Sequence, residues 1–506
     1  MNPTPTSDLP PRRGFLRRLF SWRWLRRALI GVVGLATLIG LLVTEENWRG
    51  KHDWESYRHA EEAKGESFDW QALVPPAVPD DQNFLTAPAF TNLLDDKTVF
   101  DPFPKSSKQF PFVSGNWQKA VLTDLKSWQT AYRQLREDES GNSFAVAPQP
   151  GTPAADVLFA VHKFGPEIES LRQASLRPQA FIPIHYEDGF NAVANSMLPN
   201  LAATKRCAQV LSVRAIAELA GGQCSNALSD VELLLRVNDA LRQPPFLISE
   251  LVRMAIVGID IQPIWEGLAK HQWSDPQLAA LETTLAREDF LADYELVMRG
   301  ERNCAIATYE TMRRTGEIVV SDADGTKLTV KMPWAPKAFY YQNELAFAQL
   351  YQQLLLLLDN TKLRTISPAV QRRVTAEVRA AHKHYLPYTA MALMTAPALE
   401  AAVKHFAFAQ ASVDLARVGC ALERYRLAHG QYPESLATLE PQFITHAPHD
   451  IINGQPLHYR LKPNGQFVLY SVGWNETDDG GVVVMDPKHG TVRRDEGDWV
   501  WKYPGQ

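Results

Sequence analysis

The first pattern along the chain is an apolar segment without a charge, Ala28 to Thr44. As a helix it would span roughly 26 Å, close to the thickness of a bilayer's hydrocarbon core. Seven arginines and a single acid, Asp8, lie in the 27 residues before it. Because basic residues stay on the cytoplasmic side, we predict a cytoplasmic tail at 1–27, a transmembrane helix at 28–44 in the cell inner membrane, and an extracytoplasmic remainder.

A cleaved export signal is the alternative interpretation of this segment. Residues Arg12 to Arg17 resemble a twin-arginine motif. However, more arginines separate this motif from the apolar stretch, and no small-residue cleavage site precedes Glu45 and Glu46. We therefore expect a single-pass signal anchor that stays in the membrane, which makes the membrane itself the first partner of the chain.

Residues 45–153 mix prolines with large aromatic side chains. Proline at this density excludes long helices and sheet interiors, whereas the aromatic content is too high for a free linker. We predict an extended strap docked onto the next domain, interrupted by helices over 47–64 and 117–137. The aromatic residues expected to anchor it are Trp54, Phe68, Trp70, Phe84, Phe90, Phe100, Phe103 and Phe110.

Residues 154–397 show apolar positions at three- and four-residue steps, which predicts a domain of helical hairpins. Two helices should meet at Gly221-Gly222, and Pro263 should kink or divide the helix over 247–268. A capping box starting at Ser274 predicts a helix that runs on through Tyr294, and Ser367-Pro368 predicts another start. A β-hairpin should be inserted near 317–332, with Asp-Gly as its turn.

Residues 398–506 predict a small α+β module. A helix reaching Tyr425 should end at Gly430, because glycine is the usual C-terminal cap. Alternating apolar residues over 457–462 and 466–472 flank Asn464-Gly465, a typical hairpin turn, which indicates an antiparallel sheet. The predicted fold class is therefore mainly α, with an N-terminal transmembrane helix, a helical-hairpin domain and this C-terminal module.

The succession of features in this module resembles the soluble domain of the major pseudopilins (G-type) of type II secretion. In that family a helix ending in Tyr-x-x-x-x-Gly-x-Tyr-Pro precedes a Pro-x-Asp segment and a short antiparallel sheet. The matching residues are Tyr425, Gly430, Tyr432, Pro433, Leu436, Pro448, Asp450, Gly454, Pro456, Tyr459, Tyr470, Ser471, Gly473, Asp478, Asp479, Gly480 and Gly481.

The resemblance implies a calcium site in the loop after the last hairpin strand, and oxygen donors on a glycine-rich loop suit Ca²⁺. The candidate ligands are Asn475, Asp478, Asp479 and Asp486, with a solvated acidic turn as the alternative. The likeness does not extend to the N-terminus. The fifth residue after Gly14 is a leucine where pseudopilins carry glutamate, so we do not expect incorporation into a filament.

Charge and cysteine usage narrow the function classes. After the first 27 residues the chain holds 45 basic and 56 acidic residues, a net charge of −11, which argues against a nucleic-acid partner. The four cysteines, Cys207, Cys224, Cys304 and Cys420, fit no zinc pattern, and we expect them to be small buried hydrophobes rather than disulfides.

A search for catalytic motifs finds no metalloprotease helix, nucleophile elbow or phosphate-binding loop, so we do not predict an enzyme. His382 and His384 point to different faces of a helix and cannot chelate one metal, and for His446, His449 and Asp450 a plain loop is favoured over a zinc site. We predict a membrane-anchored extracytoplasmic binding or scaffold protein whose partners are envelope or secretion-system proteins. The alternatives are an accessory component of a type II secretion or pilus-like system, or an extracytoplasmic hydrolase using Glu250, Asp260 and Glu344.

Overall fold

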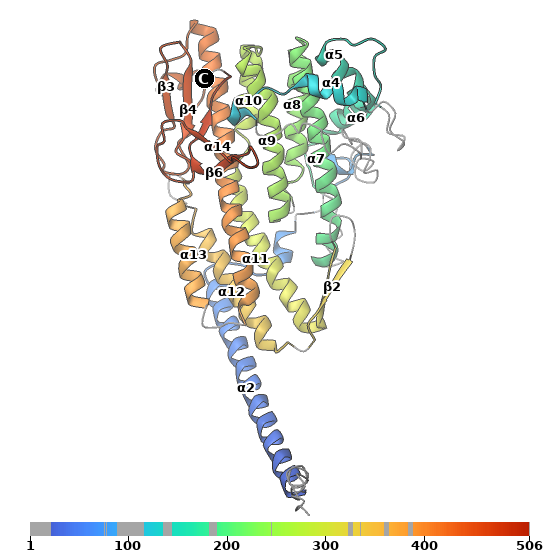
Figure 1. Cartoon of the computed structure of the whole chain (residues 1–506), viewed down its shortest axis with the longest axis vertical. Coiled ribbons are helices and arrows are strands. Elements are labelled where there is room, and N and C mark those ends of the chain that lie inside the picture. Colours follow the sequence, from blue (N-terminus) through green and yellow to red (C-terminus); the bar gives the residue numbers. More distant parts are fainter. Residues whose placement is uncertain are drawn as a thin grey trace, which may run out of the picture.

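The computed structural model describes residues 22–74, 76, 78–88, 116–134, 144–181, 190–243, 245–321, 327–333, 335–358, 364–382 and 388–504. Helices make up 64% of the structure and strands 8%, which confirms the mainly α fold class. Figure 1 shows a helical body with small sheets beside its upper part and one long helix, α2, projecting from its lower end.

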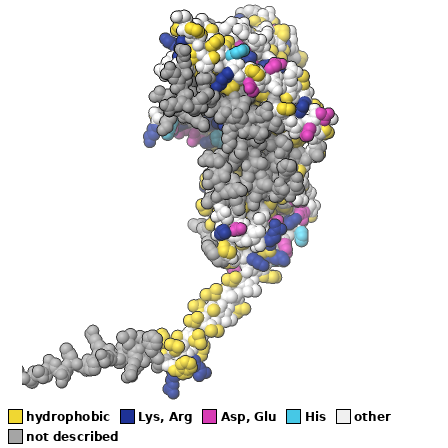
Figure 2. Space-filling view, turned by 90° about the vertical axis from the view of Figure 1, so that its right-hand side faces the viewer, with side chains coloured by type: hydrophobic (Ala, Val, Ile, Leu, Met, Phe, Trp, Pro, Cys, Tyr) yellow, Lys and Arg dark blue, Asp and Glu magenta, His cyan; other side chains and the backbone are white. Residues whose placement is uncertain are grey.

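Helix α2 (Trp22–Glu62) is continuous over 41 residues. The sequence predicted two helices, 28–44 and 47–64, but Glu45, Glu46 and Asn47 contain no glycine or proline to end the first one. The N-terminal part of α2 is long and apolar enough to cross a membrane, and its apolar window is entirely exposed. Figure 2 shows hydrophobic side chains along this projecting part and charged ones where it meets the body.

The body consists of α-helices connected by short loops and single turns of 3-10 helix. The α-helices are α4 (Leu125–Gln134), α5 (Pro153–Val161), α6 (Gly165–Ala174), α7 (Phe190–Ala220), α8 (Cys224–Asp239), α9 (Leu247–Ala269), α10 (Asp275–Leu285), α11 (Phe290–Thr315), α12 (Lys337–Leu355), α13 (Pro368–His382) and α14 (Ala390–His429). The 3-10 helices are η1 (Trp70–Leu73), η2 (Phe84–Thr86), η3 (Trp117–Lys119), η4 (His162–Phe164) and η7 (Leu436–Leu439).

Most predicted helix ends are confirmed. Helices α7 and α8 pack together as a hairpin around Gly221-Gly222, and the capping box at Ser274 opens α10. Gly430 ends α14 with φ of 79°, a left-handed conformation that glycine adopts without strain. Helix α9 passes through Pro263 without being divided.

The prediction of one helix from 275 through Tyr294 was wrong. Helix α10 ends at Leu285, and Asp289 starts α11 by accepting a hydrogen bond from the Ala292 amide at 2.9 Å. The predicted helix over 117–137 is likewise shorter. Its first residues form η3, Ala120 adopts a left-handed conformation with φ of 56°, and α4 begins only at Leu125.

The strands form three antiparallel sheets. The inserted hairpin pairs β1 (Glu317–Ser321) with β2 (Lys327–Lys331), and its turn lies outside the described residues. The predicted C-terminal hairpin is confirmed as β3 (His458–Leu461) and β4 (Phe467–Ser471), with β7 (Trp499–Trp501) on the other side of β4. A separate pair, β5 (Val483–Met485) and β6 (Val492–Gly497), completes the C-terminal region.

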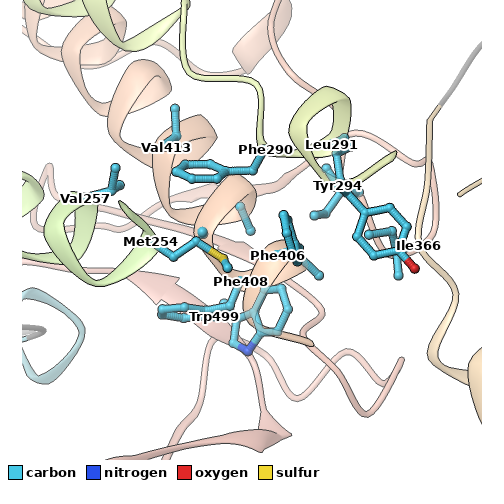
Figure 3. Packing of buried hydrophobic residues seen from close by; sticks show 14 of the residues in the cluster. Met254, Val257, Phe290, Leu291, Tyr294, Ile366, Phe406, Phe408, Val413 and Trp499 are labelled. Atoms are coloured by element: carbon cyan, nitrogen blue, oxygen red, sulfur yellow. The ribbon is translucent and has the colours of Figure 1, made fainter. Parts of the chain in front are cut away.

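The C-terminal sheet and the helices share one hydrophobic core. Helix α14 runs through Pro397 and the predicted boundary at 397/398 without a break, so both predicted domains contribute to the same helix. Trp499 of β7 packs edge-on against Phe408 of α14, with ring centroids 5.3 Å apart. Figure 3 shows Met254 of α9 pointing toward this aromatic pair.

The described part of the segment predicted as a strap packs on the body through aromatic residues. Trp54, Phe68 and Phe84 are buried, and Trp70 is half-buried. Asn83 joins this segment to the chain that follows α6, because its side-chain amide donates to the Phe181 carbonyl at 2.9 Å. The remaining predicted anchors, Phe90, Phe100, Phe103 and Phe110, lie outside the described residues.

The four cysteines are unpaired, as predicted. Three of them, Cys207, Cys304 and Cys420, are buried, whereas Cys224 at the start of α8 is only half-buried. Burial also raises the pKa of these three thiols above the usual value, which makes them poor nucleophiles.

Candidate functional site

A cavity of about 830 Å³ lies between the helical body and the β5–β6 pair. Its walls come from η3, α7, α9, α14 and β6 with the loop before it. This volume is within the range of small-molecule sites in proteins. The lining residues are Trp117, Gln118, Lys119, Lys205, Gln209, Leu251, Met254, Ala255, Val257, Gly258, Ile259, Ala401, Lys404, His405, Phe408, Ala409, Ser412, Asp486, Thr491, Val492, Arg493, Arg494 and Asp495.

One wall of the cavity is apolar and comes mainly from α9. Leu251, Met254 and Gly258 recur at three- and four-residue steps, which places them on the same face of that helix. Phe408 of α14 contributes an aromatic side chain beside Met254 (Figure 3). Gly258 leaves the cavity open, because a Cβ added there would meet no atom within 4 Å.

The other walls carry five cationic side chains. Lys119 comes from η3, Lys205 from α7, Lys404 from α14, and Arg493 and Arg494 from β6. Arg493 is neutralised by Glu496, three residues further on. Within the described part of the chain, no carboxylate forms an ion pair with any of the other four cations.

Arg494 is held by uncharged groups. Its guanidinium lies over the Phe408 ring, 4.0 Å from the centroid, and Nη1 contacts His405 Nδ1 at 2.8 Å. Since a guanidinium can only donate, Nδ1 must accept, and the imidazole is neutral with its proton on Nε2. Burial, with the charges of Arg494 and Lys404, lowers the pKa of His405 to about 4. Burial alone lowers the pKa of Arg494 to about 10.

Gln118 supplies a further donor to the cavity. Its side chain is 3% exposed, and its Nε2 atom has no hydrogen-bond partner among the described residues. A buried amide N–H without an acceptor destabilises a protein, so an acceptor that came within reach of this atom would stabilise it. Gln118 follows Trp117, which is itself fixed against Trp501 with ring centroids 5.3 Å apart.

Two carboxylates also line the cavity, both in the β5–β6 region. Asp486 Oδ1 accepts the backbone N–H groups of Lys488 at 2.7 Å and His489 at 3.0 Å. These hydrogen bonds, first the one from His489, lower the pKa of Asp486. Asp495 is exposed on β6. Neither carboxylate forms an ion pair with Lys119, Lys205, Lys404 or Arg494, so these four cations have no ion-pair partner among the described residues.

The structure divides the four predicted calcium ligands between two loops. Asn475, Asp478 and Asp479 follow β4, where Asn475 Nδ2 donates to Asp479 Oδ2 at 2.7 Å and the Tyr470 hydroxyl donates to Asp478 at 2.9 Å. Asp486 lies instead in the β5–β6 turn at the cavity. Among the described residues no three His, Cys, Asp or Glu side chains form a metal-binding group, and calcium binding stays a prediction.

The three carboxylates considered for a hydrolase do not line the cavity. Glu250 is paired with Arg253 of the same helix at 2.7 Å. Asp260 is fully buried, and burial raises its pKa well above the usual range. Glu344 lies on α12, with Oε1 3.6 Å from Nε of Arg313.

Asp450, in the segment that also holds His446 and His449, has a structural role. Its carboxylate accepts hydrogen bonds from the Ser471 hydroxyl at 2.9 Å and the Val472 amide at 2.8 Å, which fixes the loop to the end of β4. His446 is exposed. The other histidine pair falls where side chains are not described, since His384 and the side chain of His382 lie outside the described residues.

The sequence did not reveal the cationic residues of the cavity. His405 and Arg494 are separated by 89 residues, and Lys119 and Lys205 belong to two further elements. The only local signals are the doublets Lys404-His405 and Arg493-Arg494, which are common on solvated surfaces.

Comparison with known proteins assigns no family to the chain. No family model matches the sequence, and no curated protein and no solved structure matches it either. The resemblance of residues 398–506 to the major pseudopilins therefore stays a prediction from the sequence.

Proposed function

We propose that this chain is a membrane-anchored binding protein that takes up a small organic molecule in the cavity between α7, α9, α14 and β6. The observation that carries the proposal is the cavity itself, an apolar wall of α9 facing side chains with free hydrogen-bond donors. Binding sites for small molecules combine these two features, since apolar contact supplies affinity and a few polar groups fix orientation.

The anchoring part of the proposal rests on α2 and the arginines before it. The apolar part of α2 is long enough to cross a membrane, and seven arginines precede it. Because guanidinium groups stay on the cytoplasmic side, the body and its cavity would lie outside the cytoplasm, at the inner membrane. A reporter enzyme that works only outside the cytoplasm, fused after Gln506, should be active. Activity of a cytoplasm-specific reporter at that position would contradict this topology.

Gly258 offers a direct test of the cavity as a binding site. Gly258→Trp should fill the cavity, whereas Gly258→Ala leaves it open and favours the helix. The detergent-solubilised full-length protein is screened by thermal unfolding against small organic anions, cations and neutral molecules. Compounds that raise the unfolding midpoint of the wild type and of Gly258→Ala should not raise that of Gly258→Trp. A screen without such compounds would contradict the proposal.

A role as an accessory component of a secretion or pilus-like system is the second candidate function. It is supported by the order of features over residues 398–506, where a long helix ends at Gly430 and is followed by Tyr432-Pro433 and an antiparallel hairpin. Recurrent co-purification of pseudopilins with the tagged full-length protein would favour it. Their absence from repeated purifications, in the presence of other envelope proteins, would count against it.

A further inference from the structure

The unpartnered cations of the cavity indicate the class of ligand. We propose that the cavity binds a soluble organic anion, with its carboxylate or phosphate group between Arg494 and Lys404 and its apolar body on the α9 wall. This inference rests on the proposed function and narrows it to one kind of molecule.

The positions of Arg494 and Lys404 are the first argument for an anion. Both side chains line the cavity; Arg494 contacts His405, and Lys404 directly precedes His405 on α14. Asp486 and Asp495 also line the cavity, but in the described part of the chain no carboxylate forms an ion pair with Arg494 or Lys404. An anion from solution would supply the missing counter-charge.

His405 provides the second argument, because it orients Arg494 without neutralising it. A carboxylate at position 405 would form an ion pair and close the site to anions. The neutral imidazole accepts one N–H of the guanidinium at 2.8 Å and leaves the others available. With Phe408 beneath the guanidinium plane, the two side chains hold Arg494 ready to bind an oxyanion edge-on.

The donor of Gln118 and the apolar wall distinguish an organic anion from inorganic phosphate. Gln118 lines the cavity and carries an amide N–H that no described residue satisfies. Leu251 and Ala255 are the more exposed apolar residues of this wall, and a bare inorganic ion would leave them facing water. An apolar group attached to the anion would cover them.

A soluble molecule fits the position of the cavity better than a membrane lipid. The elements that line it lie beside and above the middle of α14, whereas α2 enters the body at its lower end beside α12 (Figure 1). The ligand therefore reaches the cavity from solution. A lipid would have to leave the bilayer to do so.

Calorimetric titration of the full-length protein tests the ligand class with matched probes. Phenylbutyrate should bind about tenfold or more tightly than phenylbutanamide or phenylbutylamine, because charge-assisted hydrogen bonds require the carboxylate. Inorganic phosphate and dioctanoyl phosphatidate should bind more weakly than phenylbutyrate. If the amide or the amine bound as tightly as phenylbutyrate, the proposal that the ligand is an anion would be overturned. If inorganic phosphate bound as tightly as phenylbutyrate or more tightly, the ligand would not need an apolar group. If phosphatidate did so, a membrane lipid would replace the soluble molecule as the ligand.

Variants locate the anion within the cavity. Lys404→Gln and Arg494→Gln should each weaken phenylbutyrate about tenfold, and Arg494→Lys should weaken it less. Arg373→Gln removes the same charge from an exposed position on α13, with 69% of its side chain exposed, and should leave affinity unchanged. Affinities unaffected by Lys404→Gln and Arg494→Gln would overturn the assignment of the anion to these residues.

Gly258→Trp separates the failure of this inference from the failure of the proposed function. If every compound whose binding is lost in Gly258→Trp is neutral or cationic, only the proposal that the ligand is an organic anion is refuted. Phenylbutyrate binding that persists in Gly258→Trp would place the ligand elsewhere and refute both. No binding by any probe or library compound would also refute both.

Discussion

Two regions of the molecule surround an arginine with different partners, carboxylates in one region and uncharged groups in the other. Between α9 and α11, Arg253 is fully buried and contacts three carboxylates, Glu250 at 2.7 Å, Glu288 at 2.8 Å and Asp293 at 2.8 Å. At the cavity, Arg494 contacts an imidazole and a phenyl ring. A buried charge therefore need not mark a binding site. Where the chain supplies the acceptors, an arginine contributes to the fold, and where it does not, an acceptor from solution can bind.

Replacing Arg253 should have the largest effect and tests the paired side of the comparison. Arg253→Met removes the only cation paired with Glu250 among the described residues and leaves Glu288 and Asp293 with Arg242 alone, at 3.5 and 3.4 Å. Breaking a buried ion pair in this way costs about 3 to 5 kcal/mol. Arg494→Met strands no carboxylate and should cost at most about 1 kcal/mol. Chemical unfolding of the full-length protein in detergent, followed by tryptophan fluorescence, measures both. Equal losses in the free energy of unfolding of the two variants would contradict the difference between the two arginines.

Removing Glu66 should convert a paired arginine into one that lacks its carboxylate. Glu66 Oε2 lies 2.9 Å from Arg302, which is fully buried, and Oε1 lies 3.2 Å from Arg299. Glu66→Gln keeps the shape and should lower the free energy of unfolding by about 1 to 3 kcal/mol.

Arg302 keeps other acceptors in this variant, which limits the expected loss. They include the Ser67 carbonyl at 2.8 Å and Gln352 Oε1 at 2.9 Å. The same charge change at the exposed Glu377 of α13, Glu377→Gln, is the matched control and should have little effect on the unfolding midpoint. A loss in Glu66→Gln no larger than in this control would show that the pairing at Arg302 does not stabilise the fold.

Acid should affect the cavity through His405, with the smallest effect of the three. The pKa of this imidazole is about 6.5 in an unfolded chain and about 4 in the folded one. Between these values the unfolded state binds more protons, so this contribution to stability is present above pH 6.5 and is lost as the pH falls toward 4. The charges that face the ring are Arg494 and Lys404. Solvent reaches part of the ring and screens the effect.

His405→Gln isolates this contribution from the titration of other groups. The wild type should lose stability relative to the variant as the pH falls from 7 to 5, which unfolding midpoints of both proteins across this range measure. A constant difference between the two midpoints would contradict a neutral, buried imidazole beside Arg494.

Local sequence signals predicted much of the fold. The capping box at Ser274, the glycine turn at 221–222 and the Asn464-Gly465 hairpin each depend on neighbouring residues, and the structure confirms all three. The split between α10 and α11 was missed because Asp289 acts as an N-cap inside a pattern that keeps its helical spacing. Two helices were predicted in place of α2 because the residues change from apolar to charged at 45, but this change in polarity does not interrupt the helical backbone.

The candidate site could not be predicted in the same way. Its charged residues come from four elements, and their unpaired state is visible only when every neighbouring carboxylate has been placed. The acidic residues singled out from the sequence, Glu250 and Glu344, have arginine neighbours in the fold. Sequence spacing identifies residues that share a helix face, but it does not show which charges lack a counter-ion in three dimensions.

Helix α2 connects its apolar part to the body without a break, so the two parts form a rigid connection. Beyond its apolar part the helix continues against α12, where Asn47 Oδ1 accepts the Ala338 amide at 2.7 Å and Gly50 allows close packing. A helix of 41 residues is about 60 Å long and bends only gently. With its apolar part in a bilayer, this rigid helix would hold the body at a fixed distance from the membrane and at a fixed tilt. The opening of the cavity would then keep one orientation relative to the membrane.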